Sequence, residues 1–400
     1  MKLIPAITDE FKDKAVRLCT SLAQARSETG SERSAVEVAV SAFKDIGVGE
    51  SFIDGAGNAV LDLLGTEAGP TLLVDGHADS IPLHSADKWS CDPFGGIIRD
   101  GRLYGLGICD QKASIGAMVI ATEALVRSGW RPKGRLVLVA SASEEQMEGA
   151  ALRPVLERYR PDMAITTEPT DARIFTSQRG RAKIEMRLEG RPSHAGHSSL
   201  GVNAASFAAG VIWKIASSFP RLGSSGVQLD INCIDMLSSP YPSVSTIPGG
   251  ATVRFDARFG PEQTRDSLLS HVMEAAKEVE AEWVGESPGI EVGYVKAIVT
   301  TWTGYRVEVD EFADAWSTPH DSPLVKSAIS AVGEIGSDSR LGSYSFCTNG
   351  SIICGELGIP TIGFGVGEED GAHRIDESVT IDSIHRGTAG LAAIISSILS

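Results

Sequence analysis

The sequence predicts an α/β fold built on a mainly parallel sheet and interrupted by an inserted α+β domain. Before residue 180, segments with apolar residues at helical spacing alternate with short apolar runs that are typical of buried parallel strands. Near Gly180 the pattern changes to alternating apolar and polar residues, as in strands with one solvated face. Helix and buried-strand patterns return afterwards, so we place the first domain at 1–179 and 299–400 and the insertion at 180–298.

Each element follows from its local periodicity. Helices are expected where apolar residues recur every three or four positions, over 9–27, 33–46, 114–129, 149–159, 207–219, 324–336 and 389–399. Buried strands are expected at continuous apolar runs, over 57–65, 71–77, 134–142, 162–169 and 359–367. Strands with one solvated face are expected where the period is two, over 181–194, 252–259 and 290–298.

Composition excludes several classes of partner. The 400 residues carry a formal charge of −16, which disfavours nucleic acid and anionic membranes because both would be repelled. No stretch approaches the ~18 apolar residues of a membrane span, and the first 16 residues lack the apolar core of a signal peptide. We therefore expect a cytoplasmic protein. The six cysteines include no C-x-x-C pair, which favours reduced thiols, and Cys109 is either a nucleophile or, as we favour, a buried packing residue.

Histidines and carboxylates follow several of the predicted strands. Any one of them taken alone is typical of a turn or a helix cap. Together they would gather at one edge of the sheet, because ligands of open α/β sheets collect beyond the carboxyl ends of the strands. Clustered acids repel one another and require a cation, and imidazole plus carboxylate without thiolate favours Zn²⁺, with Co²⁺ or Mn²⁺ as substitutes. These residues are His77, Asp79, Asp110, Glu144, Glu145, Glu168 and His373.

Five motifs in a fixed order resemble one family of dinuclear zinc hydrolases. They are H-x-D at 77, G-x-G-x-x-D at 105–110, E-E at 144–145, E-P-T at 168–170 and a late histidine at 373. The family includes acetylornithine deacetylase, succinyl-diaminopimelate desuccinylase, carboxypeptidase G and aminoacylase. Within it, the stretches DKWSCDPFGGIIRDGRLYG, TTEPTDARIFTSQRGR and SFCTNGSIICGELGIPTIGFGVGEEDGAH are most similar to the selenium-metabolism-linked branch. The resemblance implies a zinc-exopeptidase type catalytic domain with a ferredoxin-like lid and dimerisation domain inserted.

The resemblance also implies a ligand set for two zinc ions per subunit. His77, Asp110 and Glu168 would hold one ion, and Asp110, Glu145 and His373 would hold the other, with Asp110 as the bridge. Such a pair would activate a water and polarise the scissile carbonyl.

Two further acidic residues receive supporting roles from the same resemblance. Glu144 would be the general base that takes the proton from water and returns it to the leaving amine. Asp79 would accept the second N–H of the His77 imidazole and so fix its tautomer.

The inserted domain and a late loop supply the remaining candidates. His194 in GRPSHAGH matches the lid histidine that stabilises the oxyanion in the partner subunit of relatives, which implies a homodimer. Arg258 matches a lid arginine near a substrate carboxylate, although an ion pair with Asp256 is an equal alternative. Thr348, Asn349 and Gly350 resemble the loop that lines the same substrate pocket.

The expected function is hydrolysis of the amide bond of an N-acyl amino acid or small peptide with a free carboxylate. Glu168, where aminopeptidase relatives usually have Asp, favours deacylases and carboxypeptidase-like members. A dipeptidase or an N-carbamoyl amino acid amidohydrolase would use the same metals. A catalytically silent metal-binding regulatory protein is a third possibility, against which the presence of Glu144 argues, because a binding protein needs no base.

Overall fold

The computed structural model describes residues 7–218 and 229–400, which fall into two compact units. Unit 1 comprises Met1–Gln178, Ile298–Val307 and Trp316–Ser400, and unit 2 comprises Arg179–Ala297 and Glu308–Ala315. The sequence assigned residues 308–315 to the first domain, and the structure assigns them to unit 2. The reason is that Phe312 pairs with strand β9 (Gly180–Glu189) and packs its ring against Phe259 and Tyr294, at centroid distances of 5.4 and 5.0 Å.

Unit 1 contains the strands whose ends carry the predicted histidines and carboxylates, together with the helices that cover them. Its helices are α1 (Asp9–Gln24), α2 (Arg33–Asp45), α3 (Ala113–Arg127), α4 (Arg153–Tyr159), α7 (Pro323–Glu334) and α8 (Ile381–Leu399). The strands of its main sheet are β1 (Glu50–Ile53), β2 (Ala59–Leu64), β3 (Glu67–His77), β6 (Lys133–Ser141), β7 (Met163–Thr166), β8 (Ile174–Gln178), β18 (Trp316–Ser317), β19 (Leu341–Tyr344) and β20 (Thr361–Gly363). A small sheet joins β4 (Ile97–Arg99), β5 (Arg102–Tyr104) and β21 (Ser378–Thr380).

The main sheet of unit 1 is mixed, with a parallel centre. Among the described residues nine strands form it, in the order β1-β2-β6-β3-β7-β20-β8-β18, with β19 beside β8. Strands β6, β3, β7 and β20 run parallel, whereas β1, β2 and β18 pair antiparallel at the two sides. The parallel centre agrees with the prediction, and its carboxyl ends form one edge of the sheet.

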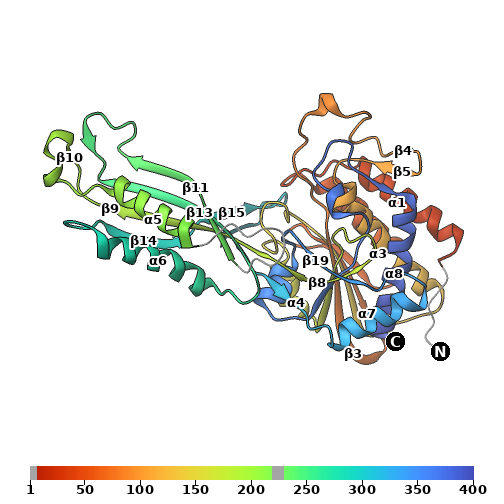
Figure 1. Cartoon of the computed structure of the whole chain (residues 1–400). Helices are drawn as coiled ribbons and strands as arrows, with labels where there is room; N and C mark the ends of the chain where they lie inside the picture. The colour runs from red at the N-terminus through yellow and green to blue at the C-terminus, as the bar shows by residue number, and fades with distance from the viewer. Residues whose placement is uncertain (1–6, 219–228) are drawn as a thin grey trace. The chain divides into compact units, whose positions relative to one another are not determined.

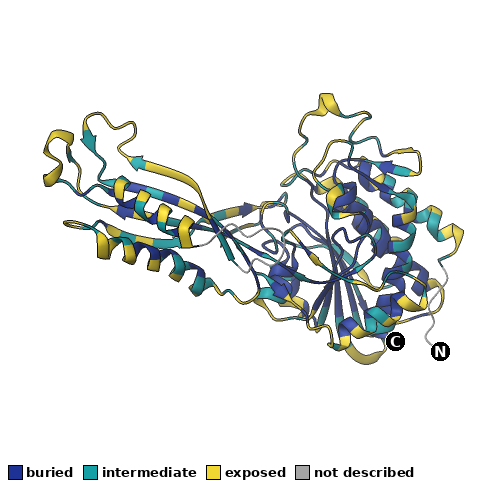
Figure 2. Cartoon of the chain, viewed as in Figure 1, coloured by how far each residue is buried: buried dark blue, intermediate teal, exposed yellow. Residues whose placement is uncertain are grey.

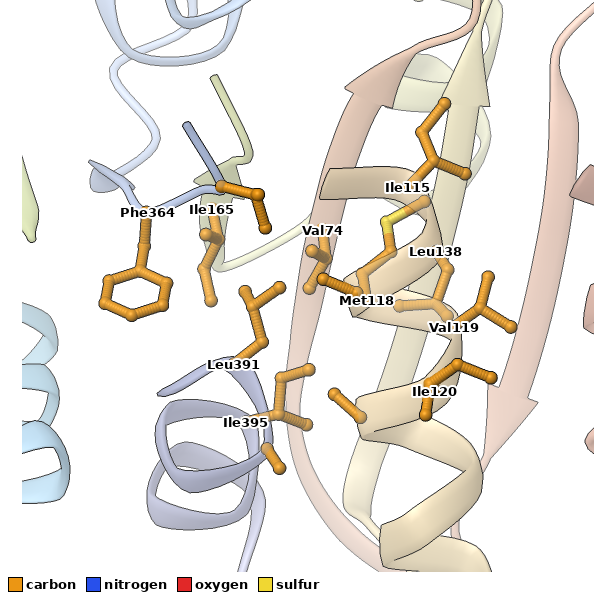
Figure 3. Close-up of a cluster of buried hydrophobic side chains, with 14 of the residues drawn as sticks. Val74, Ile115, Met118, Val119, Ile120, Leu138, Ile165, Phe364, Leu391 and Ile395 are labelled. Atoms are coloured by element: carbon orange, nitrogen blue, oxygen red, sulfur yellow. The ribbon is translucent and has the colours of Figure 1, made fainter. Parts of the chain in front are cut away.

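Both faces of this sheet are covered, which explains the continuous apolar runs of its strands. On one face Val74, Leu138 and Ile165 pack against α3 and α8 (Figure 3). On the other face the alternate residues, among them Leu73 and Val137, pack against α4 and the turn at Ser351–Glu356. Figure 1 shows α1, α3, α7 and α8 grouped on one side of the strands. Unit 1 therefore has three layers, helices on sheet on helices.

Unit 2 is an antiparallel sheet with two helices. Its chain order is β9 (Gly180–Glu189), α5 (Ala204–Ser218), β11 (Leu229–Ser239), β13 (Gly250–Phe259), α6 (Arg265–Glu282) and β14 (Gly289–Tyr294). Within the described residues the sheet order is β11-β13-β9-β14, with β17 (Phe312–Ala313) also beside β9. This βαββαβ order with β9 and β13 in the centre is the ferredoxin-like arrangement expected for the insertion.

Several predicted boundaries differ from the structure. The strand expected over 181–194 ends at Glu189, because Gly190 and Pro192 precede the two-residue strand β10 (Ser193–His194), which pairs with β12 (Thr246–Ile247). The strand expected over 290–298 divides into β14 and β15 (Lys296–Thr300), and β15 pairs with β16 (Arg306–Asp310). Helix α6 and strands β8 and β11 were not predicted. Residue 219 of the helix expected over 207–219 lies outside the described residues.

Burial follows the layers of each unit. Figure 2 shows buried residues along the main sheet and on the inner sides of the helices of unit 1, with exposed residues on their outer sides. Over residues 7–218 and 229–400, no helix combines the length and the apolar character needed to cross a membrane.

Candidate functional site

The predicted ligand residues of unit 1 meet at the carboxyl edge of the parallel strands. His77 ends β3 and pairs with Ser141, which ends β6. Glu144 and Glu145 follow β6 directly, and Glu168 follows β7. Because these three strands are parallel neighbours, their ends bring residues far apart in the chain to one place.

Asp110 lies between two imidazoles that come from different loops. Its Oδ1 is 3.0 Å from His77 Nε2, and its Oδ2 is 3.3 Å from His373 Nε2. His373 Nε2 is also 2.9 Å from Glu145 Oε1. One carboxylate therefore has an oxygen directed at each histidine, which is the arrangement that a ligand shared by two metal ions requires.

Two more carboxylates complete the cluster around His77. Its Nε2 lies 3.8 Å from Glu168 Oε2 and 4.0 Å from Glu144 Oε2. The donor atoms of His77, Glu144 and Glu168 lie within 4.8 Å of one another, and so do those of His77, Asp110 and Glu145. The first set includes Glu144, which the sequence predicted as a base rather than a ligand. Among the described residues, Glu144 Oε1 is buried without a hydrogen-bond partner, so the cluster retains an unused acceptor.

The electrostatics of the cluster favour added positive charge. Burial raises the pKa of Glu144 well above its ordinary value, and neighbouring carboxylates such as Glu168 add to the effect. Burial alone lowers the pKa of His77, but the charges of Glu168 and Glu144 outweigh it and raise that pKa well above 6.5. Hydrogen bonds to Asp110 and Glu145 raise the pKa of His373 to about 10. The same carboxylates that favour protonated histidines would favour a divalent metal ion, whose binding displaces protons.

Asp79 supports the site in a way that differs from the sequence prediction. His77 Nδ1 donates to the backbone carbonyl of Asp79 at 2.9 Å, whereas the Asp79 carboxylate is 3.6 Å away. That carboxylate instead accepts the backbone N–H groups of Glu144 and Glu145, at 3.0 and 3.1 Å, and the hydroxyl of Thr29 at 2.8 Å. Asp79 therefore fixes the turn that carries the two glutamates, and its main chain fixes the histidine tautomer.

The predicted substrate loop at 348–350 has internal partners. Asn349 is buried, donates to Asp75 at 2.7 Å and to Ser141 at 3.0 Å, and accepts the N–H of Gly149 at 2.6 Å. Thr348 is also buried, donates to Gln178 at 2.7 Å and accepts the N–H of Gly350 at 2.9 Å.

Substrate binding by the Thr348, Asn349 and Gly350 loop stays a prediction, since these contacts describe only how its side chains are held within the protein. Their polar groups already have protein partners. A Cβ at Gly350 would meet the indole nitrogen of Trp316 at 2.5 Å, so the glycine is required for packing. The side chains of this loop hold the structure beneath the site.

Two predicted residues lie in unit 2. His194 is exposed, and its Nδ1 accepts the backbone N–H of Gly196 at 3.0 Å. A neutral ring with this acceptor carries its proton at Nε2 and can donate it. Arg258 makes a two-pronged ion pair with Asp256, at 2.7 and 3.3 Å, which is the structural alternative that the sequence left open. Its side chain remains 43% exposed.

Cys109 is a packing residue, as the sequence analysis favoured. It is 1% exposed, and its thiol donates to the Glu368 carbonyl at 3.3 Å. Burial raises the pKa of the thiol well above its ordinary value, so a nucleophilic thiolate is disfavoured.

Sequence reasoning missed Glu377, which is 1% exposed and accepts three backbone N–H groups from the loop that carries Asp110. Its position four residues after His373 was the one local signal. Its partners lie 267–270 residues earlier in the chain and have no residue-type signature, so a sequence pattern could not reveal them.

Comparisons with known proteins agree with this fold and site. The chain is 26% identical over 398 residues to the uncharacterized protein YgeY of Escherichia coli strain K12, covering 98% of this chain and 96% of that protein. It is 26% identical over 366 residues to the acetylornithine deacetylase of Vibrio campbellii, covering 87% of each. The YXEP protein of Bacillus subtilis, a dinuclear metal-binding peptidase of the M20 family, has a similar fold. Its TM-score is 0.74 at 12% identity, covering 98% of this chain and 99% of that one.

The match to a family model spans most of both units. Residues 73–397 fit the model of peptidase family M20/M25/M40, a range that includes all the histidines and carboxylates of the cluster. The chain belongs to the M20/M25/M40 peptidase family.

Proposed function

We propose that this protein is a metal-dependent hydrolase that cleaves the amide bond of an N-acyl amino acid or a small peptide with a free carboxylate. The observation that carries the proposal is Asp110, whose two carboxylate oxygens face His77 and His373 at 3.0 and 3.3 Å. The buried acids around both histidines favour added positive charge at the cluster. A pair of divalent ions would supply that charge.

Five side chains would hold the two ions. His77, Asp110 and Glu168 would bind one ion, and Asp110, Glu145 and His373 would bind the other. The donor set contains nitrogen and oxygen without sulfur, which suits Zn²⁺ and also Co²⁺ or Mn²⁺. When bound, such a pair supplies Lewis acidity, which polarises a carbonyl and lowers the pKa of water.

Glu144 would move the proton. The residue is 6% exposed, its Oε1 has no partner among the described residues, and its backbone N–H donates to Asp79. A fixed carboxylate with an unused oxygen can accept a proton from the attacking water and return it to the leaving amine. Glu144 Oε2 lies 4.0 Å from His77 Nε2, which leaves Oε1 as the oxygen that would accept the proton.

Unit 2 would complete the site through a second copy of the chain. Strand β11 is the edge of the sheet, and its Ile234, Met236 and Leu237 are 53%, 40% and 54% exposed. Trp213 on α5 is 75% exposed. An apolar edge strand with an exposed tryptophan is a surface that a second copy could cover by continuing the sheet. In that homodimer, His194 would donate from Nε2 to the oxyanion formed at the other subunit's site.

Arg258 would bind the substrate carboxylate. Its guanidinium is partly exposed, so a substrate carboxylate could replace Asp256 as its partner or bind beside it. The prediction of a cytoplasmic location and the resemblance to the selenium-metabolism-linked branch stay sequence predictions.

A substrate panel with metal-loaded protein tests the proposal. The Zn²⁺- or Co²⁺-loaded chain should release amine from N-acyl amino acids, with removal of the metal by a chelator abolishing turnover and added metal restoring it. Preference for dipeptides or N-carbamoyl amino acids would assign one of the alternative activities. Tight metal binding with no turnover of any amide would indicate a silent binding protein, and full turnover after exhaustive chelation would contradict a metal-dependent reaction.

A further inference from the structure

Glu377 connects the two loops that carry Asp110 and His373. Its Oε1 accepts the backbone N–H groups of Cys109 and Asp110 at 2.8 and 3.1 Å, and its Oε2 accepts that of Gly107 at 2.9 Å. A single carboxylate thus binds three main-chain donors of the loop leading to the bridging residue.

The Asp110 loop depends on such an acceptor because its backbone is irregular. Gly107 has a left-handed φ of +72°, and a Cβ there would meet Ser80 at 2.8 Å. Asp110 and Gln111 have φ/ψ values outside the helical region within the turn Ile108–Lys112. Backbone carbonyls of the loop accept the N–H groups of Ile108 and Lys112, whereas the three N–H groups that face Glu377 have no such acceptor in the loop. Buried N–H groups without a partner are costly. Glu377 supplies the missing acceptor.

Further contacts attach the His373 loop to the same place. Gly105 donates its N–H to the backbone carbonyl of Glu377 at 3.1 Å, and the thiol of Cys109 bonds the carbonyl of Glu368. Directly after Glu377, β21 pairs with β5, with Ser378 opposite Tyr104. The two loops therefore form one hydrogen-bonded unit, at whose ends Asp110 and His373 face each other.

We propose that Glu377 is a positioning residue that sets the spacing of Asp110 and His373 and thereby the metal affinity of the pair. It touches neither metal nor substrate, and it acts through the backbone of the Asp110 loop. This inference rests on the proposed metal centre. Because Asp110 is shared between the two predicted sites, loss of its orientation should weaken the bridged pair as a whole.

Metal binding in two conservative variants separates this role from simple structural support. In Glu377→Gln an amide NH₂ must face a backbone N–H, so at least one of the three bonds is lost while the size is kept. In Glu377→Asp the charge is kept but the carboxylate is withdrawn by one methylene. The matched control is Glu368→Gln, an exposed glutamate of the same loop whose backbone carbonyl, not its side chain, makes the bond to Cys109.

The measurements use Mn²⁺ with the metal-free protein. Calorimetric titration gives affinity and stoichiometry, and electron paramagnetic resonance reports whether two bound Mn²⁺ ions are spin-coupled through a bridging carboxylate. Both Glu377 variants should bind Mn²⁺ roughly 10- to 100-fold more weakly, the usual loss when a group that orients a ligand is changed. They should also show a larger uncoupled fraction, and the control should match the wild type.

The outcomes separate the inference from the proposed function. If the wild type binds no Mn²⁺, Zn²⁺ or Co²⁺, the metal centre itself is wrong and the inference falls with it. If the wild type binds two ions and a folded Glu377 variant keeps wild-type affinity and coupling, Glu377 has only a structural role, even when the metal-free variant unfolds at a lower temperature. Circular dichroism of each metal-free variant establishes folding, and the aspartate variant carries the test if the glutamine variant does not fold.

Discussion

Replacing Glu144 by glutamine tests the assignment of the general base, because the change removes a proton acceptor and keeps the side-chain size. Glu144 is 6% exposed, its Oε1 has no partner among the described residues, and its backbone is held by Asp79. An amide can occupy the same space without taking a proton at neutral pH. General-base catalysis typically contributes about 10²–10⁴ in rate. At 1.36 kcal/mol per factor of ten, the barrier should rise by about 3–5 kcal/mol.

The assay compares turnover with metal content in the same preparations. Glu144→Gln should keep the wild-type metal stoichiometry, measured by plasma mass spectrometry, while kcat for amine release falls by about 10²–10⁴. Glu145→Gln should instead lose metal, because Glu145 faces His373 at 2.9 Å as a predicted ligand. Glu157→Gln, an exposed change on α4, should alter neither quantity.

Two results would refute the reasoning. Near-normal turnover of metal-loaded Glu144→Gln would show that the proton goes to another group. Loss of metal in Glu144→Gln, with turnover restored by excess metal, would make Glu144 a ligand. Its place in one set of donor atoms with His77 and Glu168 makes this outcome a specific alternative.

Three further predictions follow from the charges and the unit 2 histidine. Metal binding at pH 8 should release at least one proton per subunit, because His373, whose pKa is raised to about 10, keeps its ring protonated until metal displaces the proton. Calorimetry in buffers of different ionisation enthalpy counts the released protons, and zero release would contradict His373 as a ligand. In metal-free protein, the His373 pKa is raised from 6.5 to about 10, so its stabilising contribution is complete below pH 6.5 and is lost as pH rises towards 10. The difference in melting temperature between wild type and His373→Ala should shrink as pH rises over that range. A difference that grows with pH would contradict the raised pKa of His373. His194→Ala should keep its metal but lose about 10²–10³ in kcat. A mixed dimer with Glu144→Ala should regain activity, and a mixed dimer as inactive as its parents would place His194 outside the partner's site.

Local sequence patterns determined which residues meet at the sheet edge. Apolar runs ending at His77, before Glu144 and before Glu168 are read directly from the chain, and three of the strands there are parallel neighbours. Since parallel strands share one carboxyl edge, the pattern alone was sufficient to bring these groups together. The change to period two near Gly180 likewise marked the start of unit 2, because solvation of one sheet face is a local property of each strand.

Helix boundaries depended on more than periodicity. Helix α8 was expected from residue 389 and begins at Ile381, where Thr380 caps it by accepting the N–H of Ser383. Its first two turns contain Asp382 and Arg386, which form an ion pair with each other. These polar turns interrupt the apolar spacing from which the helix was predicted, so the predicted start came too late.

Only the tertiary structure decided what each polar group bonds. The carboxylate of Asp79 holds the Glu144–Glu145 turn, Asn349 is satisfied by Asp75 and Ser141, and Glu377 holds the Asp110 loop. The partners in these contacts are backbone N–H groups or buried side chains that lie 65–274 residues away in the chain. A backbone N–H is the same for almost every residue type, so its partner leaves no trace in the sequence, and only the folded chain shows which carboxylate it meets.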